Sequence, residues 1–321
     1  MFCHPLYYPE LASIRLLKEK EEQAMANLRL IHASVDASFD HIQKLGQLIL
    51  MDTSIARFIY QGIMPSGSEE IQTVIDAISL LPTSTSINSL ISEIYVYSNR
   101  SGYILSSRNA FLDPERMYPT LFAVEDLNYP QFKNKYLTSP FWLKYFPLTN
   151  ARIQGRVRPV IPYAQTFPLN SPATNAGKVL FLIDATSIIQ LLEDQESSGG
   201  LATYIIDQNN EIIVSTQNEA LPVESTYPDG QHRVHIHGKE YILSITTSSV
   251  TGLRFFSLLP ISEVRAMLNP LWVIASIASV IVFLLFALIS FIVLLRSHRK
   301  WNDVLGLAGK TLPYEDAIKY I

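Results

Sequence analysis

The sequence contains very little cysteine and no strong excess of charge of either sign. Cys3 is the single cysteine among 321 residues, so no disulfide can form within the chain. The formal net charge is −4, which gives no sign of direct nucleic-acid binding. The sequence also has no nucleophile elbow, phosphate-binding loop or zinc-protease helix motif. These absences predict a chain that is not an enzyme and needs no cofactor.

One long stretch lacks charge altogether. Leu271 to Leu295 contains no charged residue, and at 1.5 Å per residue a helix of this length reaches roughly 37 Å. The hydrocarbon core of a bilayer is about 30 Å thick, so residues 271–295 are predicted to form a transmembrane helix. Trp272 and Trp301 flank the stretch, as expected for aromatic residues at the two membrane interfaces.

Basic residues set the predicted orientation of this helix. Arg265 precedes it, whereas four basic residues follow it: Arg296, Arg299, Lys300 and Lys310. Lys and Arg favour the cytoplasmic side, so residues 1–270 are predicted to lie outside the cell membrane and the C-terminus inside. Export of such a large N-terminal region predicts a further span before Met1. The short cytoplasmic linker, residues 296–321, predicts an output domain beyond it.

Residues 1–60 are predicted to contain one long helix. No proline occurs from Leu11 to Tyr60, and apolar residues recur at a heptad-like spacing with a polar gap at Ser38. The apolar positions are Leu28, Ile31, Val35, Ile42, Leu45 and Ile49. The pattern fits an amphipathic helix packed on its own domain. It also fits a helix that in addition forms part of a dimer interface. Both roles can hold along different parts of one long helix.

Residues 61–198 are predicted to form a first sheet module. A short helix over 71–81 is expected to stop at Pro82, and a hairpin is expected from Ile91 to Ser107 around the turn "NRSG". Residues 113–177 are rich in proline and aromatic residues and are predicted to be mainly long irregular structure. The strand "RPVIPYAQTF" lies within this stretch, and "KVLFLID" follows as a central strand that leads into a short helix.

Residues 199–266 are predicted to form a second, smaller module after the boundary "SSGG". "ATYIIDQNNEIIVST" predicts a hairpin, and "QHRVHIHGKEYILSITTSSVTGLRFFSLLP" predicts three further strands. The expected fold class is therefore α+β, with a long N-terminal helix, two stacked PAS-like antiparallel-sheet modules and one transmembrane helix. Homodimerisation and contact with the lipid bilayer are expected as well.

The order of these stretches resembles the double Cache family of extracytoplasmic sensors, over roughly residues 30–265. The stretches that carry the resemblance are "EIYVYSNRSGYILSS", "GKVLFLIDATSIIQLL", "YIIDQNNEIIVS" and "GKEYILSITTSSVTGLRFFSLLPISEV". Within that family the chain is most similar to sensor regions of AraC-type transcriptional regulators of Gram-positive bacteria. The resemblance implies small-molecule sensing coupled to transcription. The same sensor precedes histidine kinases and chemoreceptors, which remain alternatives.

Candidate ligand-binding residues concentrate in the first module. A small-molecule pocket needs aromatic walls and a few converging polar groups. Arginine suits a carboxylate or phosphate, aspartate suits an ammonium, and aromatic rings stack on a cation. Arg156 is a weaker candidate than the six principal ones, which are Trp142, Tyr145, Arg152, Arg158, Tyr163 and Asp184. The alternative is that the aromatic residues belong to the core and the arginines to the surface.

The amino-acid-binding motif of the double Cache family is incomplete here. That motif places an arginine two residues before the tryptophan and a tyrosine after it, whereas this chain has Pro140 and Leu143 around Trp142. An amino-acid ligand is therefore less expected than another small molecule. A membrane-anchored module that docks a protein is the alternative function.

Two further clusters contain residue types that occur in metal sites. His235 and His237 lie two residues apart, so on a strand they share a face, and His232 is near. No cysteine or acidic cluster joins them, and exposed strand residues are the preferred interpretation. Asp207 to Glu211 offers oxygen ligands without the spacing of a calcium loop, which favours a turn. No metal site is therefore predicted.

Overall fold

The computed structural model describes most of the chain, in two compact units, Met1–Val264 and Arg265–Ile321. The described residues are 7–61, 68–87, 89–124, 127–153, 155–168, 175–199, 202–217, 221, 226–266 and 269–310.

The long N-terminal helix is present, with one break. Helix α1 spans Tyr7–Met51 and α2 spans Thr53–Gln61. Asp52 separates them, and its carboxylate accepts hydrogen bonds from the backbone N–H groups of Ser54 and Ile55 at 2.8 and 3.2 Å. This side chain therefore caps the start of α2.

Helix α3 corrects one expectation. It spans Ser68–Ile87 and does not stop at Pro82. Leu81 is fully buried in the core immediately before that proline. A proline removes one helical hydrogen bond, and tertiary packing of the preceding turn offsets this loss.

The first module contains a seven-stranded antiparallel sheet. Its strand order is β3-β2-β1-β7-β6-β4, with β5 paired to β6. The predicted hairpin of residues 91–107 is confirmed, and the strand predicted from "KVLFLID" is central, between β1 and β6. The strands are β1 (Ile91–Ser98), β2 (Ile104–Ser106), β3 (Ala110–Phe111), β4 (Leu143–Tyr145), β5 (Thr149–Ile153), β6 (Arg156–Phe167) and β7 (Gly177–Asp184).

The expectation of long irregular structure over 113–177 is wrong for most of its described residues. Beside β4 to β6, the segment contains α4 (Pro114–Leu121), α5 (Tyr129–Phe132) and a π-helical segment η1 (Lys133–Thr138). Pro114 and Pro130 stand in the first turns of α4 and α5, whereas Pro119 lies inside α4. Asp113 caps α4 with Pro114 in its first turn, and Asn128 with Gln131 forms a capping box on α5. Proline content therefore misled the sequence interpretation.

The second module contains a five-stranded antiparallel sheet in the order β10-β11-β12-β8-β9. The predicted hairpin and the three further strands are confirmed. Helix α6 (Thr186–Gly199) leads into it from β7. The strands are β8 (Ala202–Ile206), β9 (Ile212–Ser215), β10 (Gly230–Ile236), β11 (Lys239–Thr247) and β12 (Arg254–Pro260).

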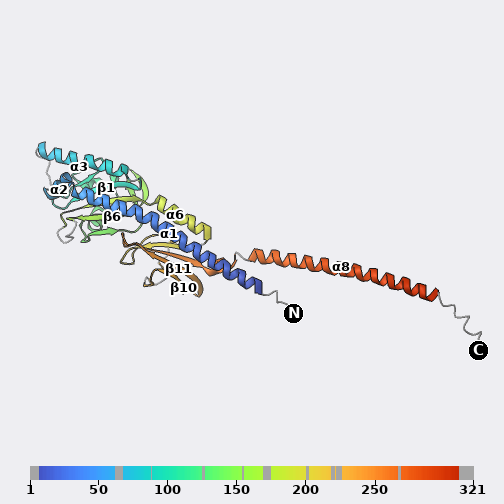
Figure 1. Ribbon diagram of the computed structural model, residues 1–321. Coiled ribbons are helices and arrows are strands. Elements are labelled where there is room, and N and C mark those ends of the chain that lie inside the picture. The colour runs from blue at the N-terminus through green and yellow to red at the C-terminus, as the bar shows by residue number, and fades with distance from the viewer. Residues whose placement is uncertain are drawn as a thin grey trace, which may run out of the picture. The chain divides into compact units, whose positions relative to one another are not determined.

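Helix α1 packs along both sheets (Figure 1). One continuous hydrophobic core joins its apolar stripe to Phe181 and Tyr163 of the first sheet and to Ile205 and Phe255 of the second. The six stripe residues predicted from the heptad-like spacing are all buried. Phe39, next to the polar gap, continues the stripe and is fully buried. The interpretation as a helix packed on its own domain is confirmed.

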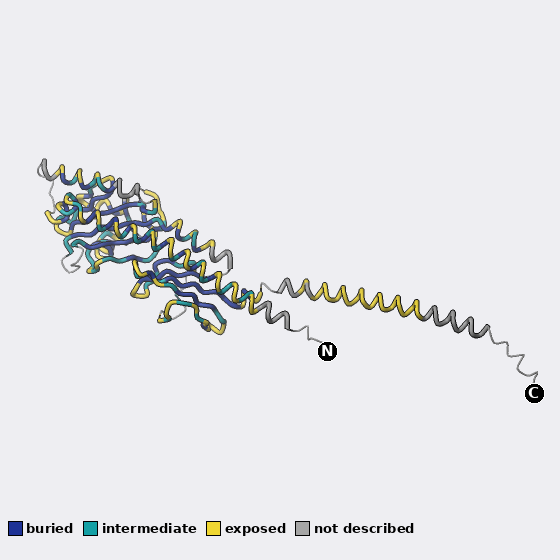
Figure 2. Tube along the Cα trace, in the orientation of Figure 1, coloured by how far each residue is buried: buried dark blue, intermediate teal, exposed yellow. Residues whose placement is uncertain are grey.

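The chain continues from β12 through α7 (Ile261–Ala266) into α8 (Asn269–Lys310). Within α8, Ser276–Ser297 is long and apolar enough to cross a membrane by length and composition. Its side chains are exposed throughout, as Figure 2 shows in yellow. The side chains of Trp272 and Trp301 lie outside the described part of the helix.

Candidate functional site

The predicted ligand-binding residues fall into three places. Tyr145 of β4 and Tyr163 of β6 are buried, and their rings stack with centroids 4.4 Å apart. Phe39 of α1 stacks on Tyr145 at 4.9 Å. Burial raises the pKa of both tyrosines well above 10, so both hydroxyls stay neutral. These two residues therefore lie in the core between the first sheet and α1.

Arg158 and Asp184 lie toward the other face of the sheet. Side chains alternate along β7, so Asp184 shares the face of Leu180 and Leu182, away from α1. The guanidinium of Arg158 is 3.8 Å from the Asp184 carboxylate, and both side chains are partly exposed. That carboxylate also accepts a 2.9 Å hydrogen bond from the backbone N–H of Thr186, at the start of α6.

The other predicted residues are exposed. Trp142 is 46% exposed and immediately precedes β4. Arg152 and Arg156 are exposed on the hairpin of β5 and β6. The structure therefore brings Tyr145 to Tyr163 and Arg158 to Asp184, but it does not gather the six residues into one cluster. The alternation of side chains along β6 and β7 is the physical reason.

Two buried charged residues on the face away from α1 were missed by the sequence analysis. The Glu93 carboxylate accepts hydrogen bonds from the hydroxyl and the backbone N–H of Ser107. Lys178 is fully buried, donates to the carbonyl of Ser139 and lies 3.2 Å from the ring centre of Phe141. Burial lowers the pKa of Lys178 to about 7. The available signal was a charge inside an apolar strand run, in "ISEIYVYS" and "GKVLFLID".

The histidines and the acidic turn of the second module have local structural contacts. His232 Nε2 lies 2.9 Å from the carbonyl of Pro228. Asp207 accepts hydrogen bonds from the backbone N–H groups of Asn209 and Glu211, so the predicted turn is confirmed. Among the described residues, no group of three or more histidine, cysteine, aspartate or glutamate side chains has a geometry that could hold a metal ion.

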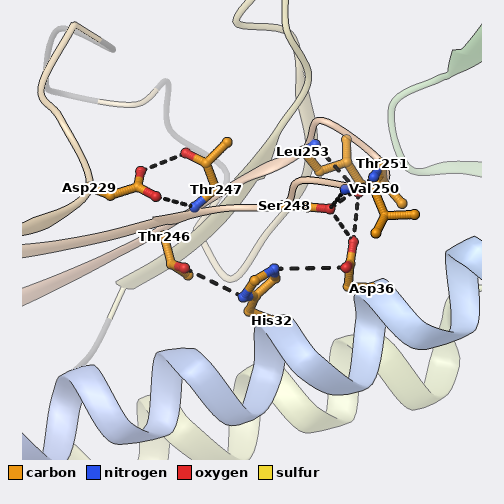
Figure 3. Close-up of polar contacts among 9 residues, drawn as sticks. All are labelled: His32, Asp36, Asp229, Thr246, Thr247, Ser248, Val250, Thr251 and Leu253. Atoms are coloured by element: carbon orange, nitrogen blue, oxygen red, sulfur yellow. Dashed lines mark hydrogen bonds and ion pairs between the residues drawn. The ribbon is translucent and has the colours of Figure 1, made fainter.

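Helix α1 makes a polar contact with the loop between β11 and β12 (Figure 3). The Asp36 carboxylate accepts hydrogen bonds from the hydroxyl groups of Ser248 and Thr251. Ser248 Oγ in turn accepts from the backbone N–H groups of Val250 and Thr251 at 3.1 and 2.8 Å. One oxygen of Asp36 therefore fixes the conformation of this loop against the helix.

His32 extends this contact one turn earlier on α1. Its Nε2 is 3.9 Å from the Asp36 carboxylate, and its Nδ1 is 3.4 Å from the Thr246 hydroxyl (Figure 3). The ring also packs on Phe255 with centroids 4.9 Å apart. We call His32, Asp36, Thr246, Ser248 and Thr251 the helix–loop junction.

The first sheet is linked to the same helix and to the second module. Gln165 of β6 donates a 2.9 Å hydrogen bond to the Gln43 carbonyl of α1. Between the modules, Lys144 and Glu211 form an ion pair at 2.9 Å, and the backbone N–H of Leu148 donates to the Ile213 carbonyl at 2.7 Å. These contacts therefore connect the two sheets, so a movement of α1 at one sheet can be transmitted to the other sheet.

No family model matches this chain, and no curated protein sequence matches it either. Solved structures of bacterial sensory domains do match. The periplasmic sensory domain of the Campylobacter jejuni chemoreceptor Tlp1 has a TM-score of 0.53 at 12% identity, covering 78% of this chain and 98% of that domain. The ligand-binding domain of chemoreceptor Tlp3 from the same organism scores 0.45 at 15% identity, covering 78% and 94%. The sensor domain of the V. cholerae histidine kinase DctB scores 0.42 at 13% identity, covering 76% and 98%.

The match to the Tlp1 sensory domain, with a TM-score of 0.53, shows a similarity of fold. In this chain that fold consists of two antiparallel-sheet modules packed along one long helix. Among the solved structures compared, it is similar to the Tlp1 sensory domain over almost the whole of that domain. The fold class expected from the sequence is therefore confirmed.

Proposed function

We propose that this chain is the sensing and membrane-anchoring part of a transmembrane signalling protein. Residues 1–270 lie outside the cell membrane and bind a small molecule, α8 crosses the bilayer, and its C-terminal end is cytoplasmic. The observation that carries this proposal is the fold, which the Tlp1 periplasmic sensory domain shares over 98% of its length. The continuous chain from β12 through α7 into the apolar segment Ser276–Ser297 supports the anchoring role.

Helix α1 is the element through which the two modules communicate in this proposal. It contributes to one core with both sheets and is fixed to the second module by the helix–loop junction. A ligand shifts a two-state equilibrium only by its difference in affinity for the two states. Binding that moves α1 relative to the first sheet would therefore favour one arrangement of the β11–β12 loop.

The ligand-contact role of the six predicted residues remains part of the proposal. Because the Arg158–Asp184 pair and Trp142 are solvent-accessible, they are the first candidates for direct contact with the ligand. Tyr145 and Tyr163 are assigned a supporting role, because their rings form the wall between the first sheet and Phe39 of α1. Arg152 is accessible on its hairpin and completes the set.

The proposal also covers the response that this signalling protein controls inside the cell. The sequence resemblance supports control of transcription through an AraC-type DNA-binding domain in a Gram-positive bacterium, with the chain acting as a homodimer. No catalytic role is proposed for the chain. A transcriptional reporter that follows the addition of ligand tests this output directly.

Membrane topology tests the proposed location. In a Cys3→Ser background, single cysteines are introduced by Ser187→Cys, in α6, and by Asn302→Cys, in α8. A membrane-impermeant maleimide is expected to label the first position in intact cells and the second only after permeabilisation. The reversed pattern would place the sheet modules in the cytoplasm and overturn the proposal. The chain that carries only Cys3→Ser has no cysteine, and it is the control for background labelling.

A further inference from the structure

One ring nitrogen of His32, in the helix–loop junction, has no hydrogen-bond partner among the residues that the structure describes. The ring packs on Phe255 of β12, and only 24% of the His32 side chain is exposed. Its Nδ1 is 3.4 Å from the Thr246 hydroxyl, whereas the buried Nε2 faces Asp36 (Figure 3). The nitrogen without a partner is therefore the one that faces a carboxylate.

The contact between His32 and Asp36 is too long for a hydrogen bond. Nε2 lies 3.9 Å from Oδ2 of Asp36, whereas N–H···O hydrogen bonds measure about 2.7–3.2 Å. The other oxygen, Oδ1, already accepts hydrogen bonds from Ser248 and Thr251. The Asp36 carboxylate therefore presents one oxygen to the loop and the other to the histidine.

The protonation state of His32 determines how strongly the ring and this carboxylate attract each other. In the neutral ring one nitrogen carries a hydrogen and the other is an acceptor. The Thr246 hydroxyl can donate or accept, so it can satisfy Nδ1 in either tautomer. Only the cation carries hydrogens on both nitrogens and places a full positive charge before Asp36. Histidine ordinarily changes its charge between about pH 5 and 8.

Asp36 gives this electrostatic effect its sign. It forms the one ion pair of His32 within the described part of the chain, and its side chain is only 17% exposed, so solvent screens the pair weakly. The loop sequence from Ser248 to Leu253 contains no charged residue. On the elements packed around the junction, the neighbouring titratable groups are Arg29, Asp40, Tyr145, Glu193, Asp194, Asp207, Asp229 and Arg254.

We propose that His32 makes the helix–loop junction responsive to pH, because its protonated ring binds Asp36 and strengthens the attachment of α1 to the second module. This inference goes beyond the proposed function, since it adds a response to protons that needs no bound ligand. The same helix shares a core with the first sheet. Acidification therefore opposes movement of α1 relative to the second sheet, whatever the first module binds.

A double-mutant cycle at two pH values tests this contact on the full chain in detergent micelles. Asp36→Asn keeps an oxygen that can accept from the loop but removes the charge, and His32→Gln keeps a polar side chain that does not titrate. Urea unfolding of the native chain, the two single variants and the double variant gives the coupling between the residues. At pH 5.5 the coupling is expected to favour folding by about threefold or more, and at pH 7.5 it should nearly vanish.

Equal coupling at the two pH values, or stronger coupling at pH 7.5, overturns the proposal. Titration of Lys178 does not affect the comparison, because all four proteins contain this residue. His41→Gln, at an exposed position on the same helix, is the matched control and should have the same effect at both pH values. The stability difference between the native chain and Asp36→Asn is a second test that does not need the histidine variant, and it should grow on acidification.

Hydrogen exchange in the β11–β12 loop gives a local measurement. The backbone N–H groups of Val250 and Thr251 donate to Ser248 Oγ, which itself donates to Asp36. The native chain and His32→Gln are compared at the same pH, so the intrinsic exchange rates cancel. At pH 5.5 the loop amides of the native chain should exchange about threefold more slowly or less, and at pH 7.5 the two proteins should agree.

Faster exchange in His32→Gln by the same factor at both pH values would show that the ring acts through its packing on Phe255, and it would overturn the proposal. Both experiments are carried out without a ligand. Their failure therefore leaves the proposed membrane location, which the labelling experiment tests, unaffected.

Discussion

The hydroxyl group of Thr251, in the loop between β11 and β12, donates a 2.8 Å hydrogen bond to the carboxylate of Asp36 on α1. The two residues are 215 positions apart in the chain. Ser248 donates to the same carboxylate oxygen, so one side chain on the helix holds both polar residues of the loop. This contact attaches the last hairpin of the second module to the helix that also packs on the first.

Removal of Asp36 is expected to destabilise the protein. Asp36→Ala leaves the Ser248 and Thr251 hydroxyls without their acceptor, and hydrogen bonds to charged groups contribute about 1.5–3 kcal/mol each. Because both hydroxyl groups bind the same carboxylate oxygen, the two contributions overlap, and we expect the free energy of unfolding to fall by roughly 2–3 kcal/mol. Urea denaturation of the chain in detergent micelles, followed by far-ultraviolet circular dichroism, measures this loss.

Asp40→Ala is the matched control one turn further along α1. Asp40 pairs with Lys44 on the helix surface, and such i,i+4 pairs contribute about 0.2–0.5 kcal/mol. Equal losses for the two aspartates would show that the helix–loop junction contributes no more than a surface ion pair.

Burial of Lys178 gives a second prediction, on the pH dependence of stability. Its pKa is lowered from 10.5 to about 7, so between these values the unfolded chain binds more protons than the folded protein. Stability therefore rises with pH from about 7 upward, with a slope of at most about 1.4 kcal/mol per pH unit. Urea unfolding at pH 7, 8 and 9 measures this slope. Trp142 fluorescence is the signal once Trp272→Phe and Trp301→Phe have removed the other two tryptophans.

Lys178→Met provides the control for this slope. Methionine keeps an unbranched side chain of similar length and removes the titration, so its stability is expected to change little between pH 7 and 9. The pKa values of Tyr95, Tyr145 and Tyr163 are raised above 10, so these folded tyrosines stay protonated in that window. Parallel slopes for the native chain and Lys178→Met would contradict the prediction.

Much of the fold could be predicted from periodicity. Strands β1, β2, β6 and β7, the strands of the second module and the stripe on α1 follow from apolar runs and heptad-like spacing, whereas β3, β4 and β5 were not predicted. The helices within residues 113–177 were missed, although Asp113-Pro114 and the Asn128 capping box carry recognisable start signals. The proline content predicts breaks in structure, whereas Pro114 and Pro130 occupy first helical turns.

The candidate site was harder to predict than the fold. Tyr145 and Tyr163 were grouped with Asp184, but the pleat places them on opposite faces of the sheet. Sequence order does not show which face of the first sheet α1 covers. The six predicted ligand-binding residues could therefore not be divided between the two faces. The partners of Glu93 and Lys178 depend on contacts between segments distant in the chain, which no local pattern contains.

A third prediction separates core from accessible residues in the predicted ligand set. Tyr145→Leu removes a ring that stacks on both Phe39 and Tyr163, and we expect a loss of roughly 2–4 kcal/mol in unfolding free energy. Trp142→Leu changes a half-exposed side chain and should stay within about 0.5 kcal/mol. Thermal and urea denaturation of the two variants compare them, and a large loss for Trp142→Leu would contradict its accessible position.

The final prediction concerns Gly46, where α1 lies close to the first sheet. A Cβ atom at this position would overlap the amide of Gln165 and lie 3.1 Å from the ring of Phe181. Gln165 is itself buried and hydrogen-bonded to Gln43 and Tyr163, so it has little freedom to move away. Overpacking of this kind costs about 1–3 kcal/mol, against a gain of about 1 kcal/mol from the helix propensity of alanine.

We therefore expect Gly46→Ala to lower the unfolding free energy by roughly 1 kcal/mol, whereas Ser38→Ala, at a polar position of the same helix, should not lower it. Combining Gly46→Ala with Gln165→Ala removes the overlapping amide. The double variant should therefore lose less unfolding free energy than the sum of the losses of the two single variants. A double-mutant cycle by urea denaturation measures this coupling. Strict additivity would show that Gln165 does not set the distance between α1 and β6, and that the helix has room to move at this sheet.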